Sequence, residues 1–119
     1  MIYRLRTVIQ ETLKQSCPNV YYYRAAKSAA FPRCVFSLDT FDDENIKYGN
    51  LTVDIYDNQD NTEQLEHIAD DIRANFEKKL MTTWGITCAC YYDRTLVLEA
   101  DDKELNRRQV QFTLRIYEG

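Results

Sequence analysis

The sequence predicts an α+β domain, in which two helices pack on one face of a mostly antiparallel sheet of about five to six strands. Two observations support this fold class. Apolar residues recur at three- and four-residue spacing in residues 1–17 and again in residues 63–80, as in amphipathic helices. Segments in which apolar and polar residues alternate, as in half-buried strands, lie on both sides of the second helix. The expected order is α-β-β-β-α-β-β-β, in one domain over residues 1–119.

The first predicted helix covers residues 1–17. Cys17-Pro18 ends it, because the residue before a proline avoids the helical conformation. Its apolar stripe consists of Ile2, Leu5, Val8, Ile9 and Leu13.

Three strands are predicted between the two helices. Aromatic and β-branched residues favour a strand over 20–24, and the small residues that follow favour a loop over 25–32. A second strand covers 34–39 and leads to an acidic turn at 42–45. The third strand covers 51–56, where apolar and polar residues alternate.

The second helix follows a polar turn at 57–62, whose short side chains favour turns. Asn61 or Thr62 is expected to cap the helix. The core-facing stripe consists of Leu65, Ile68, Ala69, Ile72, Phe76 and Leu80.

The C-terminal third is predicted to contain three more strand segments. Trp84 is expected to hold the connection 81–85 against the core. Strands over 86–92 and 95–100 are expected to form a hairpin around a turn at 93–94. After a charged stretch, the last strand carries alternating apolar residues, namely Val110, Phe112, Leu114 and Ile116.

The cysteines and the N-terminal segment favour a cytoplasmic origin. Cys17, Cys34, Cys88 and Cys90 form no Cys-x-x-Cys pair, so we expect reduced, buried thiols. A disulfide framework or a metal site is the alternative. The N-terminal segment lacks the pattern of a signal peptide. No apolar run reaches the roughly 20 residues that cross a bilayer, so no membrane partner is expected.

Charge is unevenly distributed along the chain. Residues 1–38 carry six basic side chains and one acidic, whereas residues 39–71 carry eleven acidic side chains and one basic. The acidic middle disfavours nucleic-acid binding, which needs clustered Lys and Arg. Two solvated faces of opposite sign are one interpretation, and head-to-tail self-association of these regions is the other.

The sequence offers little chemistry. The single histidine, His67, is expected on the solvent face of the second helix, and without a second histidine it makes no typical zinc site. A nucleophilic pair of His67 with a cysteine stays open as an alternative. Tyr21 and Tyr23 share a strand face and could stack on nucleobases, but ordinary sheet or interface contacts are favoured. We therefore expect no catalytic residues, no metal and no cofactor.

Several segments together resemble a known family. They are Phe-Pro-Arg-Cys-Val-Phe-Ser-Leu at 31–38, Leu-Thr-Val-Asp-Ile-Tyr-Asp-Asn at 51–58 with the helix directly after it, and the closing strand Val-Gln-Phe-Thr-Leu-Arg-Ile-Tyr. With the N-terminal amphipathic helix, this pattern resembles the tail completion proteins (tail terminator or head–tail joining proteins) of long-tailed bacteriophages and prophages.

The resemblance implies a non-enzymatic virion part. Such a subunit assembles with itself into a ring, commonly a hexamer, that caps the tail tube or joins it to the head. Its other partners would be phage tail or head-connector proteins, and it would lie in the virion after assembly in the bacterial host cytoplasm.

The charge map and the aromatic residues suggest which side chains make the subunit contact. The candidates are Tyr21, Tyr23, Lys27, Phe31, Asp42 and Asp43. The competing function is a small host module that binds a ligand or peptide in a pocket lined by Trp84 and the tyrosine cluster.

Overall fold

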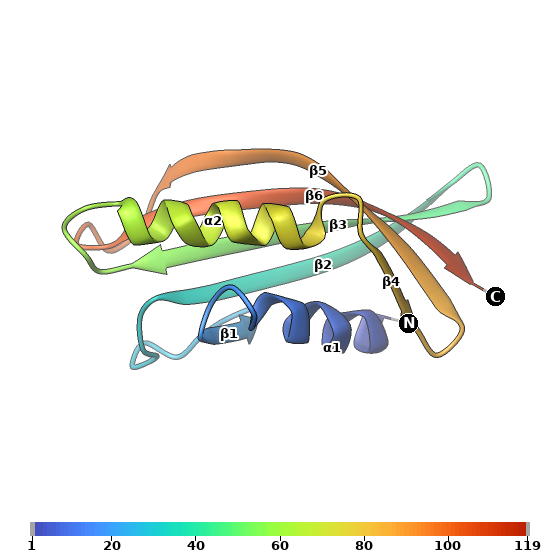
Figure 1. Cartoon of the computed structure of the whole chain (residues 1–119). Helices are drawn as coiled ribbons and strands as arrows, with labels where there is room; N and C mark the ends of the chain where they lie inside the picture. Colours follow the sequence, from blue (N-terminus) through green and yellow to red (C-terminus); the bar gives the residue numbers. More distant parts are fainter. Residues whose placement is uncertain (1, 119) are drawn as a thin grey trace.

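The computed structural model describes residues 2–118, and its central feature is one six-stranded sheet that carries two helices (Figure 1). The predicted α+β class and element order are confirmed. In chain order the elements are α1 (Ile2–Leu13), β1 (Asn19–Tyr22), β2 (Arg33–Asp43), β3 (Ile46–Asp57), α2 (Glu63–Phe76), β4 (Leu80–Thr83), β5 (Ile86–Glu99) and β6 (Asn106–Glu118).

The strand order across the sheet is β1-β2-β3-β6-β5-β4. Neighbouring strands are antiparallel except β1 and β2, which are parallel. The two outermost strands are short: β1 pairs with Arg33–Phe36 and β4 pairs with Ile86–Ala89. Within the described residues, no strand covers the rest of either outer edge. The sheet therefore has two partly covered edges, that of β2 beside β1 and that of β5 beside β4.

Both helices pack on the same face of the sheet, as predicted. The buried positions of each long strand alternate, and paired strands bury residues opposite one another, such as Val53 and Val110. From α2 the core receives Leu65, Ile68, Ala69, Ile72 and Phe76. From α1 it receives Leu5, Ile9 and Leu13, with Val8 half-buried beside them. The side chain of Ile2, the other residue of the predicted stripe, lies outside the described part.

The second helix is shorter than its apolar stripe suggested. It ends at Phe76, because Glu77 is extended (ψ 123°) and Lys78 has a positive φ of 59°. Leu80 therefore belongs to β4, where its side chain is 66% exposed, and its assignment to the helix stripe was wrong. At the other end, the Glu63 N–H donates to Asn61 Oδ1 at 3.2 Å, whereas the Thr62 side chain makes no capping hydrogen bond.

The prediction that Trp84 holds the connection 81–85 against the core is wrong. It lies in the tight turn between β4 and β5, where Trp84 and Gly85 both have positive φ, and its side chain is 79% exposed. This turn directs the indole away from the sheet. Arg4 of α1 packs over the indole at 5.6 Å and donates a hydrogen bond to the Trp84 carbonyl at 3.3 Å.

The predicted hairpin around residues 93–94 does not exist. Instead β5 is one continuous strand that pairs with β6 along its whole length, and a β-bulge between Tyr92 and Arg94 absorbs the extra residue. Tyr92 faces the core, where its ring lies 6.0 Å from that of Phe112. The chain reverses later, in the charged stretch between β5 and β6. The two strands predicted over 86–92 and 95–100 are thus one strand, and the number of strands agrees with the prediction only because β4 was not predicted.

The acidic turn at 42–45 is tighter than predicted. Only Glu44 and Asn45 make the turn, both with positive φ (49° and 68°), so β2 and β3 continue almost to its tip. Two consecutive positive-φ residues are the signature of a two-residue hairpin that follows the twist of its strands. This hairpin projects beyond the helices at one end of the molecule (Figure 1).

The four cysteines are free and buried, as predicted. Cys88 and Cys90 lie on the helix-facing side of β5, and burial raises the pKa of Cys88 to about 11. Because the thiolate is the reactive form, both burial and the raised pKa slow alkylation.

We expect native protein to react slowly with a thiol reagent at pH 8 and denatured protein to react fast at all four cysteines. Mass spectrometry after timed labelling measures this. Rapid native labelling at Cys88 or Cys90, or an intact mass two units low for any bridged pair, would contradict the prediction.

Candidate interaction site

The six residues predicted to make a subunit contact lie in two separate places. Lys27 and Phe31 belong to the loop between β1 and β2, and Tyr21 and Tyr23 lie in and just after β1. Asp42 and Asp43 are exposed at the end of β2, beside the hairpin turn. The molecule is elongated, 46 × 24 × 23 Å, and the hairpin and the β1–β2 loop lie at opposite ends of it (Figure 1). One subunit therefore does not bring all six together.

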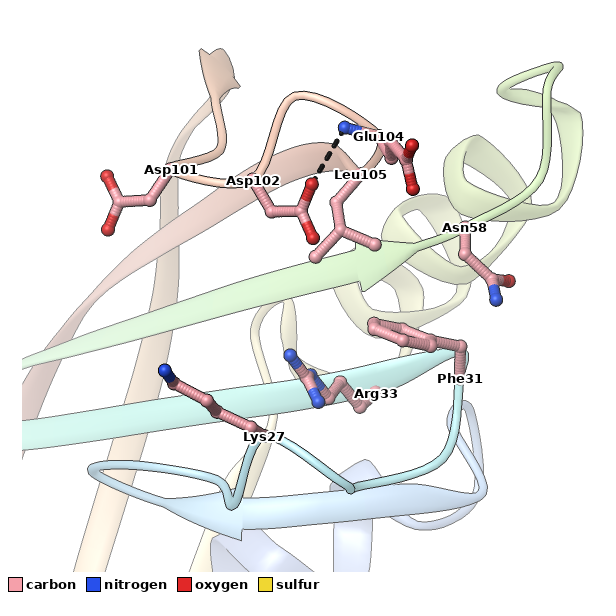
Figure 2. A pocket seen from close by; sticks show the side chains of 8 residues that line it. All are labelled: Lys27, Phe31, Arg33, Asn58, Asp101, Asp102, Glu104 and Leu105. Atoms are coloured by element: carbon pink, nitrogen blue, oxygen red, sulfur yellow. Dashed lines mark hydrogen bonds between the residues drawn. The ribbon is translucent and has the colours of Figure 1, made fainter.

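An open cleft of about 670 Å³ lies at the end away from the hairpin (Figure 2). Lys27, Phe31 and Arg33 form one side of it, and the loop between β5 and β6 forms the other. Its lining is completed by Asn58, Asp101, Asp102, Glu104 and Leu105. Sequence reasoning treated the acidic loop only as a charged connection, although its cluster of carboxylates was visible in the sequence.

The basic side of the cleft is held by the fold itself. The Arg33 guanidinium packs 4.3 Å from the ring centroid of Phe31, and its Nη1 donates to the carbonyls of Ala26 and Ala29 at 3.3 and 3.2 Å. Arg33 thus anchors the β1–β2 loop to the sheet. Neither Trp84 nor any tyrosine of residues 21–23 lines this cleft, so the cleft differs from the pocket expected for a binding module.

A second surface combines tyrosine and arginine side chains of α1, the end of β1 and the two residues that follow it, namely Tyr3, Arg6, Tyr22, Tyr23 and Arg24. We call it the Tyr/Arg surface. The Arg6 guanidinium lies 5.0 Å from the ring centroid of Tyr3 and 4.8 Å from that of Tyr22, and Arg24 lies 5.4 Å from Tyr23. Tyr3 and Tyr23 are 69% and 66% exposed. Large exposed aromatic and arginine side chains are typical of binding hot spots.

A third surface is the acidic hairpin tip, which we define as residues 39–48. Its carboxylates are Asp39, Asp42, Asp43 and Glu44. Phe41 and Tyr48 stack across the two strands with ring centroids 5.5 Å apart, and Phe41 is 45% exposed. The Lys47 ammonium is engaged by Glu118 at 3.5 Å. The tip therefore presents an aromatic pair, of which Phe41 is exposed and Tyr48 half-buried, together with exposed negative charge.

The sheet face away from the helices carries a partly buried polar network. Arg107 donates to Asp54 Oδ1 from Nε at 3.0 Å and from Nη2 at 2.8 Å, and Gln109 donates to the same oxygen at 3.0 Å. Burial alone lowers the pKa of Arg107, but the hydrogen bonds and charge of Asp54 outweigh it and raise that pKa. Arg107 therefore stays charged, and the network ties β3 to β6.

His67 lies on the solvent side of α2, as predicted, with its side chain 74% exposed and Nε2 3.9 Å from Glu63. Over residues 2–118, no group of three or more His, Cys, Asp or Glu side chains is arranged to hold a metal ion. Neither described helix is long and apolar enough to cross a membrane.

The fold of this chain, rather than its sequence, is similar to that of known proteins. No protein-family model matches the sequence, and no curated protein matches it. The fold is similar to that of a chain in the solved virion of a native gene transfer agent (GTA) particle. The match has a TM-score of 0.73 and covers 98% of this chain and 96% of that chain, at 12% sequence identity. At this identity the likeness establishes a shared fold over nearly the full length of both chains.

Proposed function

We propose that this chain is a non-enzymatic structural subunit of a long-tailed phage or prophage virion. It closes with copies of itself into a ring, expected to be a hexamer, that terminates the tail tube or joins the tail to the head. The observation that carries this proposal is the full-length fold match to a chain of a gene transfer agent virion. The resemblance of the sequence to tail completion proteins points to the same class.

The distribution of surfaces supports ring assembly. A ring needs two different complementary patches on each subunit, because a patch that binds itself closes a dimer instead. Here the basic and aromatic candidates Tyr21, Tyr23, Lys27 and Phe31 lie away from the acidic candidates Asp42 and Asp43. Their separation within one subunit is the arrangement that a head-to-tail contact requires.

The proposed partners follow from this role. Besides copies of itself, the subunit binds other tail or head-connector proteins of the particle, and it binds no specific nucleic-acid sequence. It is made in the bacterial host cytoplasm and ends in the virion.

Self-association is expected to depend on both protein concentration and salt. We expect a monomer or weak oligomer in dilute solution and rings at high concentration. Raising the salt weakens association, because the Debye length is only about 10 Å at 0.1 M and shorter above it. Light scattering after size exclusion at low and high salt, with electron microscopy of the concentrated protein, tests this. A monomer under all conditions, with no rings on the grid, would overturn the proposal.

The cleft lined by Lys27, Arg33 and Asp101 favours a second candidate, a host module that binds a small ligand or peptide. Such a module would be monomeric and would bind a peptide with both basic and acidic side chains, matching the two walls. Titration of short zwitterionic peptides against wild-type and Asp101→Lys protein separates the two functions. Saturable binding that the substitution abolishes would favour the module.

A further inference from the structure

We infer that the acidic hairpin tip of one subunit docks on the Tyr/Arg surface of the next copy, and that this contact orders the subunits head to tail. The inference rests on the proposed function, which supplies the ring, and it names the elements that meet at the subunit boundary. The partner that docks on the Tyr/Arg surface is a second copy of this chain. Three observations support the inference: charge, exposure and the geometry of the hairpin.

The charges of the two surfaces are opposite and unpaired. Over residues 2–118, no basic nitrogen lies within 4.0 Å of a carboxylate oxygen of Asp42, Asp43 or Glu44, and no carboxylate lies that close to Arg6 or Arg24. Lys47 is the cross-strand partner of Asp42, but its ammonium pairs with Glu118. Each surface therefore offers charged groups that form no ion pair among residues 2–118. Complementary potentials of this kind fix the orientation of partners and speed their encounter.

The end of the acidic hairpin tip and the Tyr/Arg surface of the same chain lie too far apart to contact each other. Tyr22 packs against Phe36 with ring centroids 5.1 Å apart, which places the Tyr/Arg surface beside the first residues of β2. From Phe36 to Asp43 the extended strand advances by roughly 23 Å, at about 3.3 Å per residue. Asp42 and Asp43 are thus carried well away from Tyr22 of their own chain, and a neighbour is needed to bring the two surfaces together.

Both surfaces also provide apolar area for a contact. The exposed rings of Tyr3 and Tyr23 offer flat amphipathic area, and the Phe41–Tyr48 stack offers the matching aromatic pair. The tight turn at Glu44 and Asn45 presets the hairpin, so that less conformational entropy is lost on docking. Arginine can then pack on the stacked rings while it pairs with the carboxylates.

Reciprocal charge reversal tests the inference. One variant reverses the tip (Asp42→Lys with Asp43→Lys), and a second reverses the Tyr/Arg surface (Arg6→Glu with Arg24→Glu). Each alone is expected to raise the concentration for half-maximal association at least tenfold. When the two are mixed, each reversed surface meets an opposite charge, so association returns as oligomers with equal, alternating copies of both variants. Native mass spectrometry reads their composition.

A matched control reverses two carboxylates of the same acidic region away from the tip. Asp70 and Asp71 are exposed on α2, and Asp70→Lys with Asp71→Lys makes the same change in net charge. We expect it to associate within twofold of wild type. Circular dichroism melts of every variant show whether it folds, and the mixed sample gives a second readout, since only folded subunits co-assemble.

Each outcome is decisive. Wild-type rings together with unimpaired tip-reversed rings would overturn the docking inference and leave the proposed function standing. The docking inference would also be overturned, with the proposed function left standing, if both variants lost association, had wild-type melts and did not recover association on mixing. Wild-type protein that never associates would overturn the proposed function and the inference together.

Discussion

Ile68→Asp is expected to lower the free energy of unfolding by about 3–5 kcal/mol. Ile68 is 6% exposed and lies in the stripe by which α2 packs on the sheet. The substitution removes apolar contacts and places a carboxylate in the buried stripe of α2. Urea unfolding followed by circular dichroism measures the change.

The control for this substitution is the neighbouring residue on the opposite side of the same helix. His67 is largely exposed, with Nε2 3.9 Å from Glu63, so His67→Ala is expected to change the free energy of unfolding by no more than about 0.5 kcal/mol. The contrast depends on helix orientation alone. A larger effect at His67 than at Ile68 would show that α2 packs by another face.

Asp54→Ala is expected to cost about 2–3 kcal/mol, the second largest effect. It removes the single oxygen that accepts hydrogen bonds from Arg107 and Gln109, and the side chains of Asp54 and Arg107 are only 19% and 24% exposed. The loss comes mainly from leaving a partly buried guanidinium without its partner. Urea unfolding of the variant measures it.

Two further variants separate this network from ordinary surface charge. Lys47→Ala breaks the more exposed pair with Glu118 and is expected to cost no more than about 0.5 kcal/mol. The double variant Asp54→Leu with Arg107→Met removes both charges and is expected to recover at least half of the loss. If Asp54→Ala proves as mild as Lys47→Ala, the network contributes nothing special to the sheet.

The parts of the fold that the sequence predicted are those in which burial is periodic. The stripe from Leu65 to Phe76 and the alternation in β6 each involve a single face against a single core, so the pattern alone determines them. The errors fall where periodicity stops. A bulge and a turn both interrupt alternation with one or two polar residues, so residues 93–94 could not show whether β5 reverses. Only the pairing with β6 decides it.

Backbone conformation at single residues accounts for the other two errors. Leu80 continues the three- and four-residue spacing of α2, but the positive φ at Lys78 ends the helix before it. Trp84 is large and apolar, which favours burial, yet a turn with positive φ directs it outward. Lysine and tryptophan rarely adopt positive φ, for which asparagine and glycine are the usual residues, so the sequence did not indicate these conformations.

The candidate contact residues were chosen from composition and charge, and the structure adds their geometry. The sequence indicated that basic and acidic regions are separate along the chain, but not that they lie far apart in space. That distance depends on the length of the β2–β3 hairpin, which the short predicted strands underestimated. The acidic wall of the cleft, with Asp101 and Asp102, depends likewise on where β5 ends.

The half-covered edge of β5 has a consequence for how the isolated protein behaves in solution. Beyond Cys90, whose backbone pairs with Lys78 and Lys79, this strand has no outer neighbour among the described residues, and Val97 on it is 74% exposed. A long, flat, apolar edge is a template on which further copies stack without limit. The bulge at Tyr92 and Arg94 bends the strand out of plane, and the flanking charges of Asp93 and Arg94 disfavour a second strand alongside it. The bulge at residues where the sequence suggested a hairpin thus opposes edge-to-edge stacking of the isolated protein.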